Sequence, residues 1–423
     1  MSASQATQRR GIGCSTGSCV VAPLAVLAAP ILGLAVFVLG GCAGTDAGSA
    51  ARWTTTVDTL PDGRVHVVNT PPASGIRPMW VIEPEVVIGS VDDEGPTAFG
   101  LIKGLVALDD GRIAVLDAMA QEIRIFAPDG THLRTFGRKG AGPAEMQDAN
   151  GMALGPDGLI RVHDPRNVRI SFFHPDSGFV RSHRIPIGSW GWIWDGVVDS
   201  AGKVWEPQYA ILDGEEWDIL RGLDGEGNWS DTVRLQKREE RPRDPPGGYR
   251  WEIPNGVRFA PIPFWPRGAG VYDPRGHFWH KRPHENDYRI FRVTPPADTT
   301  LVFESGRPAM PVTAAERDSA IAALRASGAP ALDWSKIPSE KPIVEGLFVD
   351  ASGRVWVRVA TPDTLVTYDV FLPDGRYDGT AVTSLRIPQW WSPLVRGDRV
   401  YTLVTDELDV QYVVRARIRR VGE

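Results

Sequence analysis

One segment of the chain, Gly104 to Phe136, holds four short apolar runs separated by turn residues, and this pattern recurs downstream. The runs cover residues 105–108, 112–116, 122–126 and 132–136, and the breaks include Asp-Asp-Gly and Pro-Asp-Gly. Apolar runs of about four to six residues between Gly, Pro and Asp turns indicate β-strands rather than helices. We therefore expect an all-β fold built from four-stranded units.

The unit repeats after Gly151, where Asp164 takes the place of Asp117 and Phe173 that of Phe126. Glycines at the corresponding turns are separated by 47, 44, 74, 77 and 44 residues; they are Gly111, Gly158, Gly202, Gly276, Gly353 and Gly397. Four-stranded propeller blades repeat about every 40 to 50 residues. The spacing predicts a β-propeller whose two long intervals carry insertions of roughly 30 residues each.

Three tryptophans, Trp205, Trp279 and Trp356, each lie three residues after one of these turn glycines. Large aromatic side chains dominate core packing, so we expect them to fill the wedges between blades rather than to bind a ligand.

Three segments make the chain resemble the six-bladed β-propeller proteins with NHL-like repeats that occur as bacterial lipoproteins. They are LDAMAQEIRIF at 116–126, FGRKGAGPAEM at 136–146 and HDPRNVRISFF at 163–173. The resemblance covers about residues 80–420. It implies six four-stranded blades, and it implies little about function because one fold serves many functions.

The two ends of the chain are expected to complete one blade. The segment from Pro84 parallels the one from His132, which makes Val86 to Gly89 an outermost strand without inner partners of its own. The C-terminal segments 393–396, 399–404 and 411–418 supply three such partners. Closure by the N-terminal strand would remove exposed sheet edges. The alternative is a seventh blade that uses a hairpin predicted at 53–70.

The first 41 residues look like a lipoprotein signal peptide. Their only charges are Arg9 and Arg10, which precede a long uncharged run that ends in Leu39-Gly40-Gly41-Cys42. A basic start, an apolar stretch and small residues are typical of an export signal, and the last four residues resemble a lipobox, whose Cys42 would be acylated after cleavage. An uncleaved membrane helix is the alternative. The expected location is the bacterial cell envelope, anchored by lipid and facing the periplasm or the cell exterior.

After cleavage, residues 42–52 would be a short tether and residues 53–423 the propeller. Of the three cysteines, only Cys42 would remain after cleavage, so no disulfide is expected. The formal net charge of −6 would become −8, because residues 1–41 hold two arginines and no acidic residue. That charge argues against nucleic acid as a partner. We expect a monomer whose membrane contact is the lipidated Cys42.

The two insertions, about 236–268 and 305–344, differ in character. The first is rich in proline and is expected to pack irregularly against one end of the ring. The second contains the one clear helix, in which Thr313 and Glu316 form a capping box and Gly328 marks the end. A helix this short is expected to dock on the propeller. Either insertion would serve as a lid or as a structural flap.

Two groups of residues invite a binding interpretation. His277, His280 and His284 suggest zinc, but positions 277 and 280 of a strand face opposite sides, so packed or solvated histidines are expected. Trp190, Trp192 and Trp194 share one face of a strand, which would either stack a flat ligand or be buried.

One set of positions is predicted to ring the mouth of the central channel, since each residue begins an innermost strand: Lys103, Asn150, Asp195, Ala269, Glu345 and Trp390. Asn150-Gly151 and Asp195-Gly196 also resemble blade motifs of the gluconolactonase and regucalcin family, where an Asn, an Asp and a Glu hold a divalent cation. The resemblance implies Asn150, Asp195 and Glu345 as ligands for Ca²⁺ or another divalent cation. That family places its Glu in the first blade, so a circular shift is needed, and Lys103 would put an ammonium beside the metal.

No catalytic residue is assigned from the sequence. The favoured function is a non-enzymatic, lipid-anchored module that binds a protein, peptide or glycan through loops at the channel mouth and needs no cofactor. The alternative is a lactonase-like hydrolase or lyase that depends on a divalent cation in the central channel.

Overall fold

The computed structural model describes residues 52–92, 94–185, 193–194, 196–224, 226–238, 246–294, 298–362 and 364–422. Contacts within the chain separate Ala47–Glu423, as a second unit, from the residues before it. All described residues belong to the second unit, and the predicted signal peptide and Cys42 lie outside them. No helix in these described ranges is long and apolar enough to cross a membrane.

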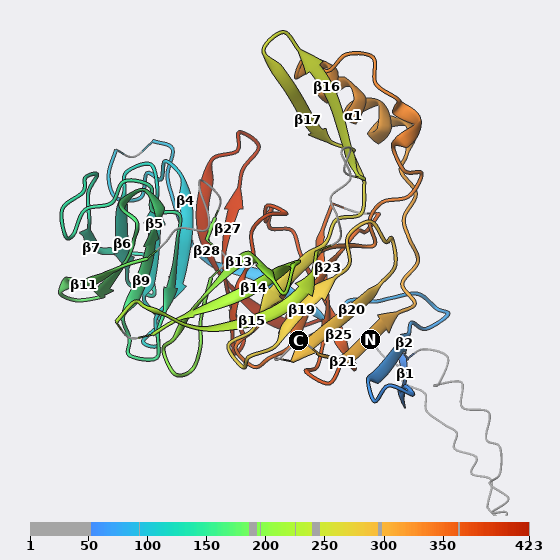
Figure 1. The fold of residues 1–423 in the computed structure, drawn as a ribbon, viewed down its shortest axis with the longest axis horizontal. Helices are drawn as coiled ribbons and strands as arrows, with labels where there is room; N and C mark the ends of the chain where they lie inside the picture. Colours follow the sequence, from blue (N-terminus) through green and yellow to red (C-terminus); the bar gives the residue numbers. More distant parts are fainter. Residues whose placement is uncertain are drawn as a thin grey trace, which may run out of the picture. The chain divides into compact units, whose positions relative to one another are not determined.

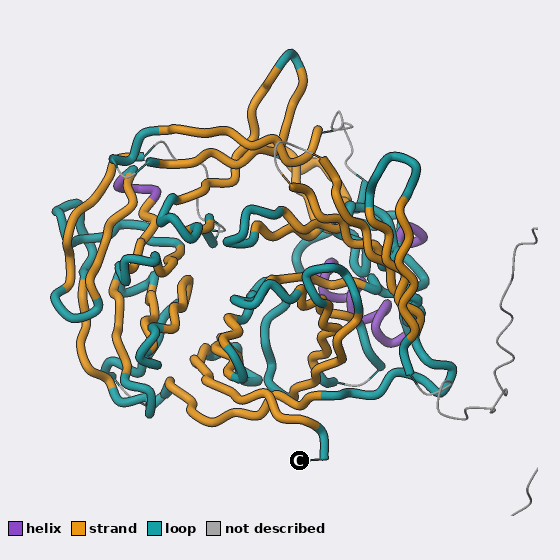
Figure 2. The backbone as a smooth tube through the Cα atoms, turned by 90° about the horizontal axis from the view of Figure 1, so that it is seen from below, coloured by secondary structure: helices purple, strands orange, loops and turns teal. Residues whose placement is uncertain are grey.

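The second unit is all-β and propeller-like, with sheets of antiparallel strands arranged around a common centre (Figures 1 and 2). The first sheet contains β4 (Ile102–Ala107), β5 (Ile113–Asp117), β6 (Glu122–Phe126) and β7 (His132–Phe136), in that order. The second sheet contains β8 (Gly151–Leu154), β9 (Ile160–Asp164), β10 (Arg169–His174) and β11 (Gly178–Arg184). The third contains β12 (Val197–Val198), β13 (Val204–Leu212), β14 (Glu215–Leu223) and β15 (Trp229–Lys237).

The fourth sheet has six strands, because a hairpin extends it. Its sequential part is β18 (Ala269–Tyr272), β19 (Phe278–Lys281), β20 (Arg289–Thr294) and β21 (Asp298–Ser305). The hairpin of β1 (Thr54–Thr59) and β2 (Val65–Thr70) adds to the outer edge, where β2 runs parallel to β21. The hairpin predicted at 53–70 therefore exists but extends another sheet instead of starting one of its own.

The fifth sheet has eight strands and joins the two ends of the chain. It contains β22 (Val344–Val349), β23 (Val355–Val359), β24 (Val366–Phe371), β25 (Tyr377–Thr383), β3 (Trp80–Ile88), β28 (Gln411–Arg420), β27 (Arg399–Thr405) and β26 (Leu394–Arg396). Strand β3 pairs antiparallel with β28 along its length, from Trp80 opposite Arg420 to Ile88 opposite Val413. The N-terminal strand thus completes the C-terminal strands, as the sequence predicts.

Strand β3 is longer than the predicted Val86–Gly89 because a bulge accommodates Pro84. Val86 lies opposite Arg415 and Pro84 lies opposite Ala416, so Glu85 is an extra residue on β3. A proline has no N–H for the ladder, and bulges are among the few places where a strand tolerates one.

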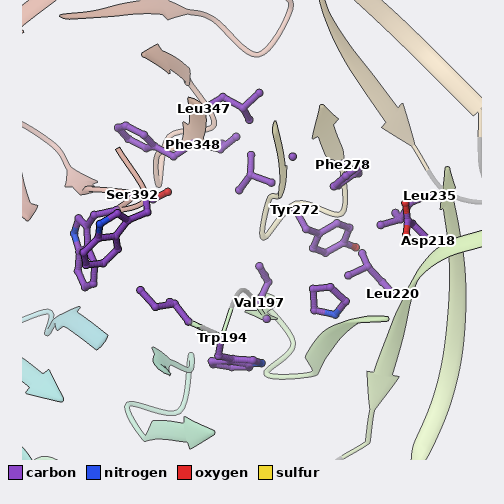
Figure 3. A pocket seen from close by; sticks show the side chains of 18 of the residues that line it. Trp194, Val197, Asp218, Leu220, Leu235, Tyr272, Phe278, Leu347, Phe348 and Ser392 are labelled. Carbon is purple, nitrogen blue, oxygen red and sulfur yellow. The ribbon is translucent and has the colours of Figure 1, made fainter. Parts of the chain in front are cut away.

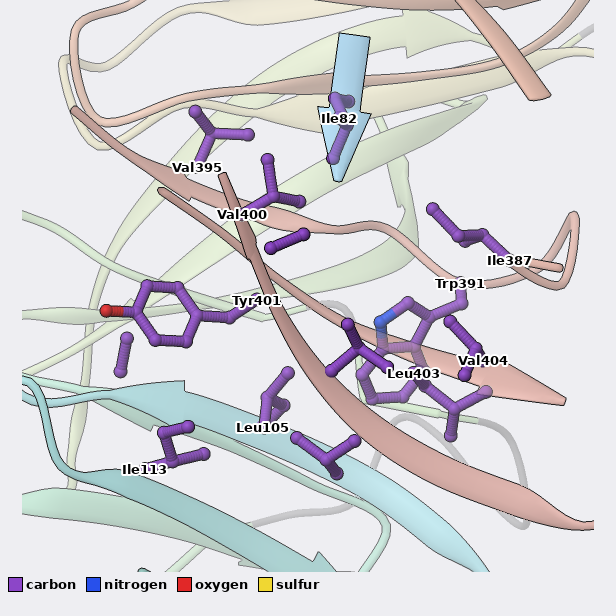
Figure 4. Packing of buried hydrophobic residues seen from close by; sticks show 14 of the residues in the cluster. Ile82, Leu105, Ile113, Ile387, Trp391, Val395, Val400, Tyr401, Leu403 and Val404 are labelled. Atoms are coloured by element: carbon purple, nitrogen blue, oxygen red, sulfur yellow. The ribbon is translucent and has the colours of Figure 1, made fainter. Parts of the chain in front are cut away.

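The largest apolar core lies where the fifth sheet meets the first (Figure 4). Leu105 and Ile113 of the first sheet belong to the same buried cluster as Val400, Tyr401 and Leu403 of β27. Ile82 of β3 is also a member, so the N-terminal strand contributes to the core as well as to the ladder. Burial of such side chains is the main favourable term that holds neighbouring sheets together.

The six turn glycines that define the repeat all have positive φ, between +62° and +91°. Residues with a side chain rarely adopt this conformation, which explains why glycine recurs at these turns. In three of the turns an aspartate accepts a hydrogen bond from the indole of the tryptophan six residues later. The pairs are Asp199 with Trp205, Asp273 with Trp279 and Asp350 with Trp356, at 2.9, 2.9 and 3.0 Å.

The three tryptophans are packing residues, as predicted. Trp279 and Trp356 are buried and Trp205 is half-buried. Asp117 and Asp164, the other repeated pair, bind main-chain N–H groups of the loop that enters their own sheet: Asp117 accepts from Gly100 and Leu101, and Asp164 from Gln147 and Asp148. The repeated aspartates therefore have a structural role, because their hydrogen bonds hold the loops that connect the sheets.

The two insertions pack on each other. The first forms a hairpin of β16 (Gly248–Ile253) and β17 (Gly256–Pro261), and the second forms helix α1 (Ala314–Ala326), with its predicted capping box. Tyr249 and Ile262 of the first insertion share a small core with Ile321, Leu324 and Ile337 of the second. The expectations of irregular packing in the first insertion and of a helix docked on the propeller are therefore wrong. The hairpin and helix lie side by side (Figure 1).

A central cavity as the candidate ligand site

A cavity of about 720 Å³ lies among the innermost strands of the sheets (Figure 3). Its wall includes residues of β4, β8, β12, β18, β22 and β26, which begin the successive four-strand sets. Cavities of about 300 to 1,000 Å³ are typical of small-molecule sites. Neither the β16–β17 hairpin nor helix α1 contributes a described lining residue, and Arg238, at the start of the first insertion, is the one described residue of the two insertions that lines the cavity.

The cavity extends sideways into the third sheet because β12 is very short. Only Val197 and Val198 form β12, and they pair with Trp205 and Val204 at the start of β13. The rest of β13 and the facing part of β14 are not covered by an inner strand, so residues 207–209 and 218–220 line the cavity.

Most of the wall is apolar. Aliphatic side chains come from several different strands, for example Leu105, Met152, Val271, Leu347 and Leu220. Buried or half-buried aromatic rings add to them and are Trp194, Tyr272, Phe278, Phe348 and Trp391.

Two further rings in the wall remain open to solvent: Trp390 is 56% exposed and Tyr209 is 65% exposed. Burial raises the pKa of Tyr272 to about 12, so its phenol is neutral near pH 7.

Three charged side chains line the cavity: Lys103, Asp218 and Arg238. The guanidinium Nε of Arg238 donates a hydrogen bond to Asp218 Oδ1 at 2.5 Å, and the same guanidinium lies 4.9 Å from the ring centre of Tyr209. Lys103 Nζ lies 3.9 Å from Asp148 Oδ1, which is too long for a hydrogen bond. Arg238 and Asp218 therefore neutralise each other closely, whereas Lys103 has only a distant counter-charge.

Trp194 contacts a buried cluster of polar side chains, Glu206, His163 and Asn150. The Trp194 indole N–H donates to Glu206 Oε1 at 2.9 Å, and its ring stacks on His163 at 5.5 Å with an interplanar angle of 3°. His163 Nδ1 lies 2.7 Å from Asn150 Oδ1, which only accepts, so Nδ1 carries the proton and donates. Burial lowers the pKa of His163 to about 4, and the ring is neutral at physiological pH.

Of the six predicted channel-mouth residues, Lys103 and Trp390 line this cavity. Asn150 is fully buried and contacts His163, and Glu345 Oε2 pairs with Arg358 Nε at 3.2 Å. Ala269 is not among the lining residues, although its neighbour Gly270 is. Asp195 lies outside the described residues, as do Trp190 and Trp192.

The predicted equivalence of these positions has a geometric counterpart. Ile102 and Gly104 pair with adjacent residues of β5, so Lys103 is an extra residue in β4. Val344 and Gly346 likewise pair with adjacent residues of β23, which makes Glu345 an extra residue in β22. Such bulges redirect a side chain at the start of a strand.

The sequence did not indicate the residues from the outer strands of the third sheet, Tyr209, Asp218 and Arg238. A usable signal was present, since only Val197-Val198 precede the turn at Gly202, where the other repeats have three to six strand residues. A missing inner strand leaves the next strand open to the channel.

In the described part of the chain, no three His, Cys, Asp or Glu side chains lie close enough together to bind one metal ion. The three histidines considered for zinc have other contacts. His280 stacks between Phe278 and Phe291, at 5.4 and 5.2 Å, and His284 Nδ1 accepts from the Trp265 indole at 3.0 Å. His277 Nδ1 lies 3.2 Å from the Thr294 hydroxyl.

No family model matches the chain, and no curated protein matches it. Among solved structures it is similar to a Bacteroides fragilis protein described as exported, with 12% identity, a TM-score of 0.45, and coverage of 80% of this chain and 95% of that one. It is also similar to virginiamycin B lyase from Staphylococcus aureus, with 10% identity, a TM-score of 0.41, and coverage of 80% and 99%. A protein described as a gluconolactonase gives 14% identity, a TM-score of 0.35, and coverage of 81% and 100%.

Proposed function

We propose that this protein is a binding module of the bacterial cell envelope, anchored by lipid at Cys42, that holds its ligand in the central cavity. The observation that carries the proposal is the cavity itself, about 720 Å³ in volume and lined by more apolar and aromatic side chains than polar ones. This combination is typical of ligand sites, where apolar walls supply affinity and a few polar groups fix orientation.

The proposal includes six blades. In the eight-stranded sheet, β3 pairs with β25 at only two positions, Trp80 opposite Ala381 and Val81 opposite Val382, whereas it pairs with β28 along its length. The sheet therefore divides most naturally between β25 and β3. The division leaves β22–β25 as one blade and β26, β27, β28 and β3 as the last.

The described wall supports binding more directly than catalysis. Its ionisable side chains are Lys103, Asp218, Arg238, Tyr209 and Tyr272. Asp218 is tied to Arg238, and the raised pKa of Tyr272 makes its phenol a poor base at neutral pH. General acid–base catalysis works best with a group whose pKa lies near the working pH.

The walls also narrow the range of ligands among the protein, peptide and glycan classes that we expected. A glycan needs hydrogen-bond partners for most of its hydroxyls, and aliphatic side chains such as Leu105 and Leu347 offer none. A ligand with an apolar part fits these walls better.

The test uses the unit 47–423, in which all described packing lies. Its thermal unfolding is measured with a panel of peptides, glycans and amphiphiles, because a ligand that binds only the folded state raises Tm. The Leu394→Trp variant fills the cavity from a side chain that is already 36% exposed, so we expect the ligand-free Tm to be unchanged. At least one compound should raise Tm in the wild type but not in this variant.

A matched control is Leu133→Trp, since Leu133 lies on β7 with 44% exposure and does not line the cavity. This variant should respond to the compound like the wild type. If both variants respond like the wild type, the ligand binds elsewhere and the proposal fails.

The cation-dependent hydrolase or lyase remains a prediction. The two described members of its ligand set do not fit a metal as they stand, because Asn150 Oδ1 already accepts from His163 and Glu345 is paired with Arg358. If a cation does bind there, a chelator should lower Tm and Asp195→Ala should abolish that response. Identical melting with calcium and with chelator would remove this alternative.

A further inference from the structure

We propose that the ligand of the central cavity is an amphiphile with one apolar chain and an anionic head group, the chain lying against the aliphatic walls and the head group at Lys103. This inference rests on the cavity being the ligand site. It adds the chemical class of the ligand and a residue that determines specificity.

The apolar chain follows from the character of the wall. At about 30 Å³ per molecule, the cavity volume corresponds to roughly two dozen waters. Aliphatic side chains such as Met152, Val271 and Leu220 give those waters few hydrogen-bond partners. Replacement of such water by an alkyl chain removes apolar surface from water on both sides, which favours binding.

The anionic group follows from Lys103. Its side chain as a whole is only 14% exposed. An ammonium has three donors, yet no described residue accepts a hydrogen bond from Nζ, and Asp148 Oδ1 is 3.9 Å away. A carboxylate or phosphate in the cavity would supply that acceptor, and hydrogen bonds between charged groups are the strong ones.

The other charged groups of the wall do not compete for the head group. Arg238 and Asp218 are joined by a hydrogen bond and form a neutral pair. Lys103 is therefore the one described lining charge without such a bond, and it makes the cavity selective for an anion over a cation.

An apolar peptide is less well suited to this cavity than an amphiphile. Each peptide unit brings an N–H and a C=O that need partners after they leave water. The inner strands are short, with two to four residues in β12, β26, β8 and β18 and six in β4 and β22, so they offer only short stretches for main-chain pairing. An alkyl chain has no such requirement.

The experiment measures binding of three probes with the same twelve-carbon chain, dodecanoate, dodecyl maltoside and dodecyltrimethylammonium, by isothermal titration calorimetry on the unit 47–423. Concentrations stay below those at which the probes form micelles. We expect dodecanoate to bind most tightly and the cationic probe most weakly.

Two lysine variants isolate the role of the ammonium. Lys103→Met keeps the length of the side chain but removes its charge, and it should weaken dodecanoate binding about tenfold while leaving dodecyl maltoside unchanged. Lys139→Met makes the same change of net charge at an exposed residue outside the cavity and should change neither. Leu394→Trp should weaken the binding of all three probes.

Equal affinity of the wild type for the three probes would contradict the proposal that the ligand has an anionic head group. An equal loss of dodecanoate affinity in the two lysine variants would contradict it as well. If no probe binds but a peptide or glycan does, and Leu394→Trp blocks it, this inference fails while the proposed function stands. If Leu394→Trp blocks no compound at all, both fail.

Discussion

Two buried histidines should make the fold sensitive to mild acid. His280 lies on β19 between the rings of Phe278 and Phe291, and its Nδ1 has no hydrogen-bond partner among the described residues. His163 lies beneath the cavity, against Asn150 and Trp194, with Glu206 Oε1 3.9 Å from its Nε2. The pKa of each ring is lowered from 6.5 to about 4, by burial for His163 and by burial together with the nearby Arg282 for His280.

The sign and size of the effect follow from proton linkage. Between about pH 6.5 and pH 4 the unfolded chain binds a proton at each of these histidines while the folded chain does not, so stability falls as the pH falls. The pKa lowering of each histidine corresponds to about 3 kcal/mol of unfolding free energy, at about 1.4 kcal/mol per pKa unit. The two together should cost about 6 kcal/mol by pH 4, a large part of the stability of a typical domain.

The perturbation that tests this is His280→Phe. Phenylalanine keeps the stacked arrangement between Phe278 and Phe291 and has no nitrogen to protonate. Urea unfolding of the unit 47–423 is measured at about pH 7.5 and about pH 4.5, and the variant should lose about 2 to 3 kcal/mol less than the wild type between them. Carboxylates titrate in both proteins alike and cancel in the difference.

The control is His174→Phe, at an exposed position on β10, which should lose as much stability as the wild type. If His280→Phe and the wild type lose the same free energy between the two pH values, the imidazole is not kept neutral by the fold. The assignment of acid sensitivity to His280 would then be refuted.

Three further predictions concern the anchor, the turns and the closure. Cys42→Ala should block lipid labelling and signal processing; labelling that persists would reject the lipobox. Trp356→Phe removes a buried indole and its 3.0 Å bond to Asp350, and chemical unfolding should show a loss of about 2 to 3 kcal/mol, against almost none for the exposed Trp390→Phe. Deletion of residues 53–90 removes β3 and exposes the edge of β28, so the protein should aggregate or unfold without cooperativity; a monomer with an unchanged Tm would contradict this role of β3.

The strands and the helix were predictable because their signals are local. Six turn glycines with positive φ mark the repeat, and each is required by the conformation of its own turn. The capping box at Thr313 and Glu316 likewise needs only four adjacent residues. The pairing of β3 with β28 was also predictable, since a repeat that lacks inner strands at one end and an outer strand at the other has one simple completion.

Features that depend on contacts distant in sequence were not predictable. The core shared by Tyr249 and Ile321 joins two insertions that are separated by β18 to β21, and no local pattern indicates that pairing. The length of β3 was underestimated because Pro84 normally argues against a central strand, and the bulge at Glu85 that accommodates it depends on the partner strand.

The candidate site was predicted only in part, because its extent depends on the inner strand of the third sheet being nearly missing. The repeat places Lys103 and Trp390 at the channel, and both line the cavity. The side extension exists because β12 has two residues while β13 and β14 have nine each, so side chains of outer strands reach the channel. An alignment of repeats compares residues that are present and gives little weight to a strand that is nearly missing.

The exposed aromatic rings of this wall are a further reason to propose a binding role for it. Trp390 and Tyr209 keep 56% and 65% of their surface exposed, so they contribute little to the core; Tyr209 lies on β13 and Trp390 in the turn before β26. Single exposed apolar residues are ordinary on a protein surface, but two large rings beside aliphatic walls in one cavity form a patch that would be more stable when covered. Neither the β16–β17 hairpin nor helix α1 lines this cavity in the described structure, so those two elements do not cover the rings, whereas the proposed ligand would.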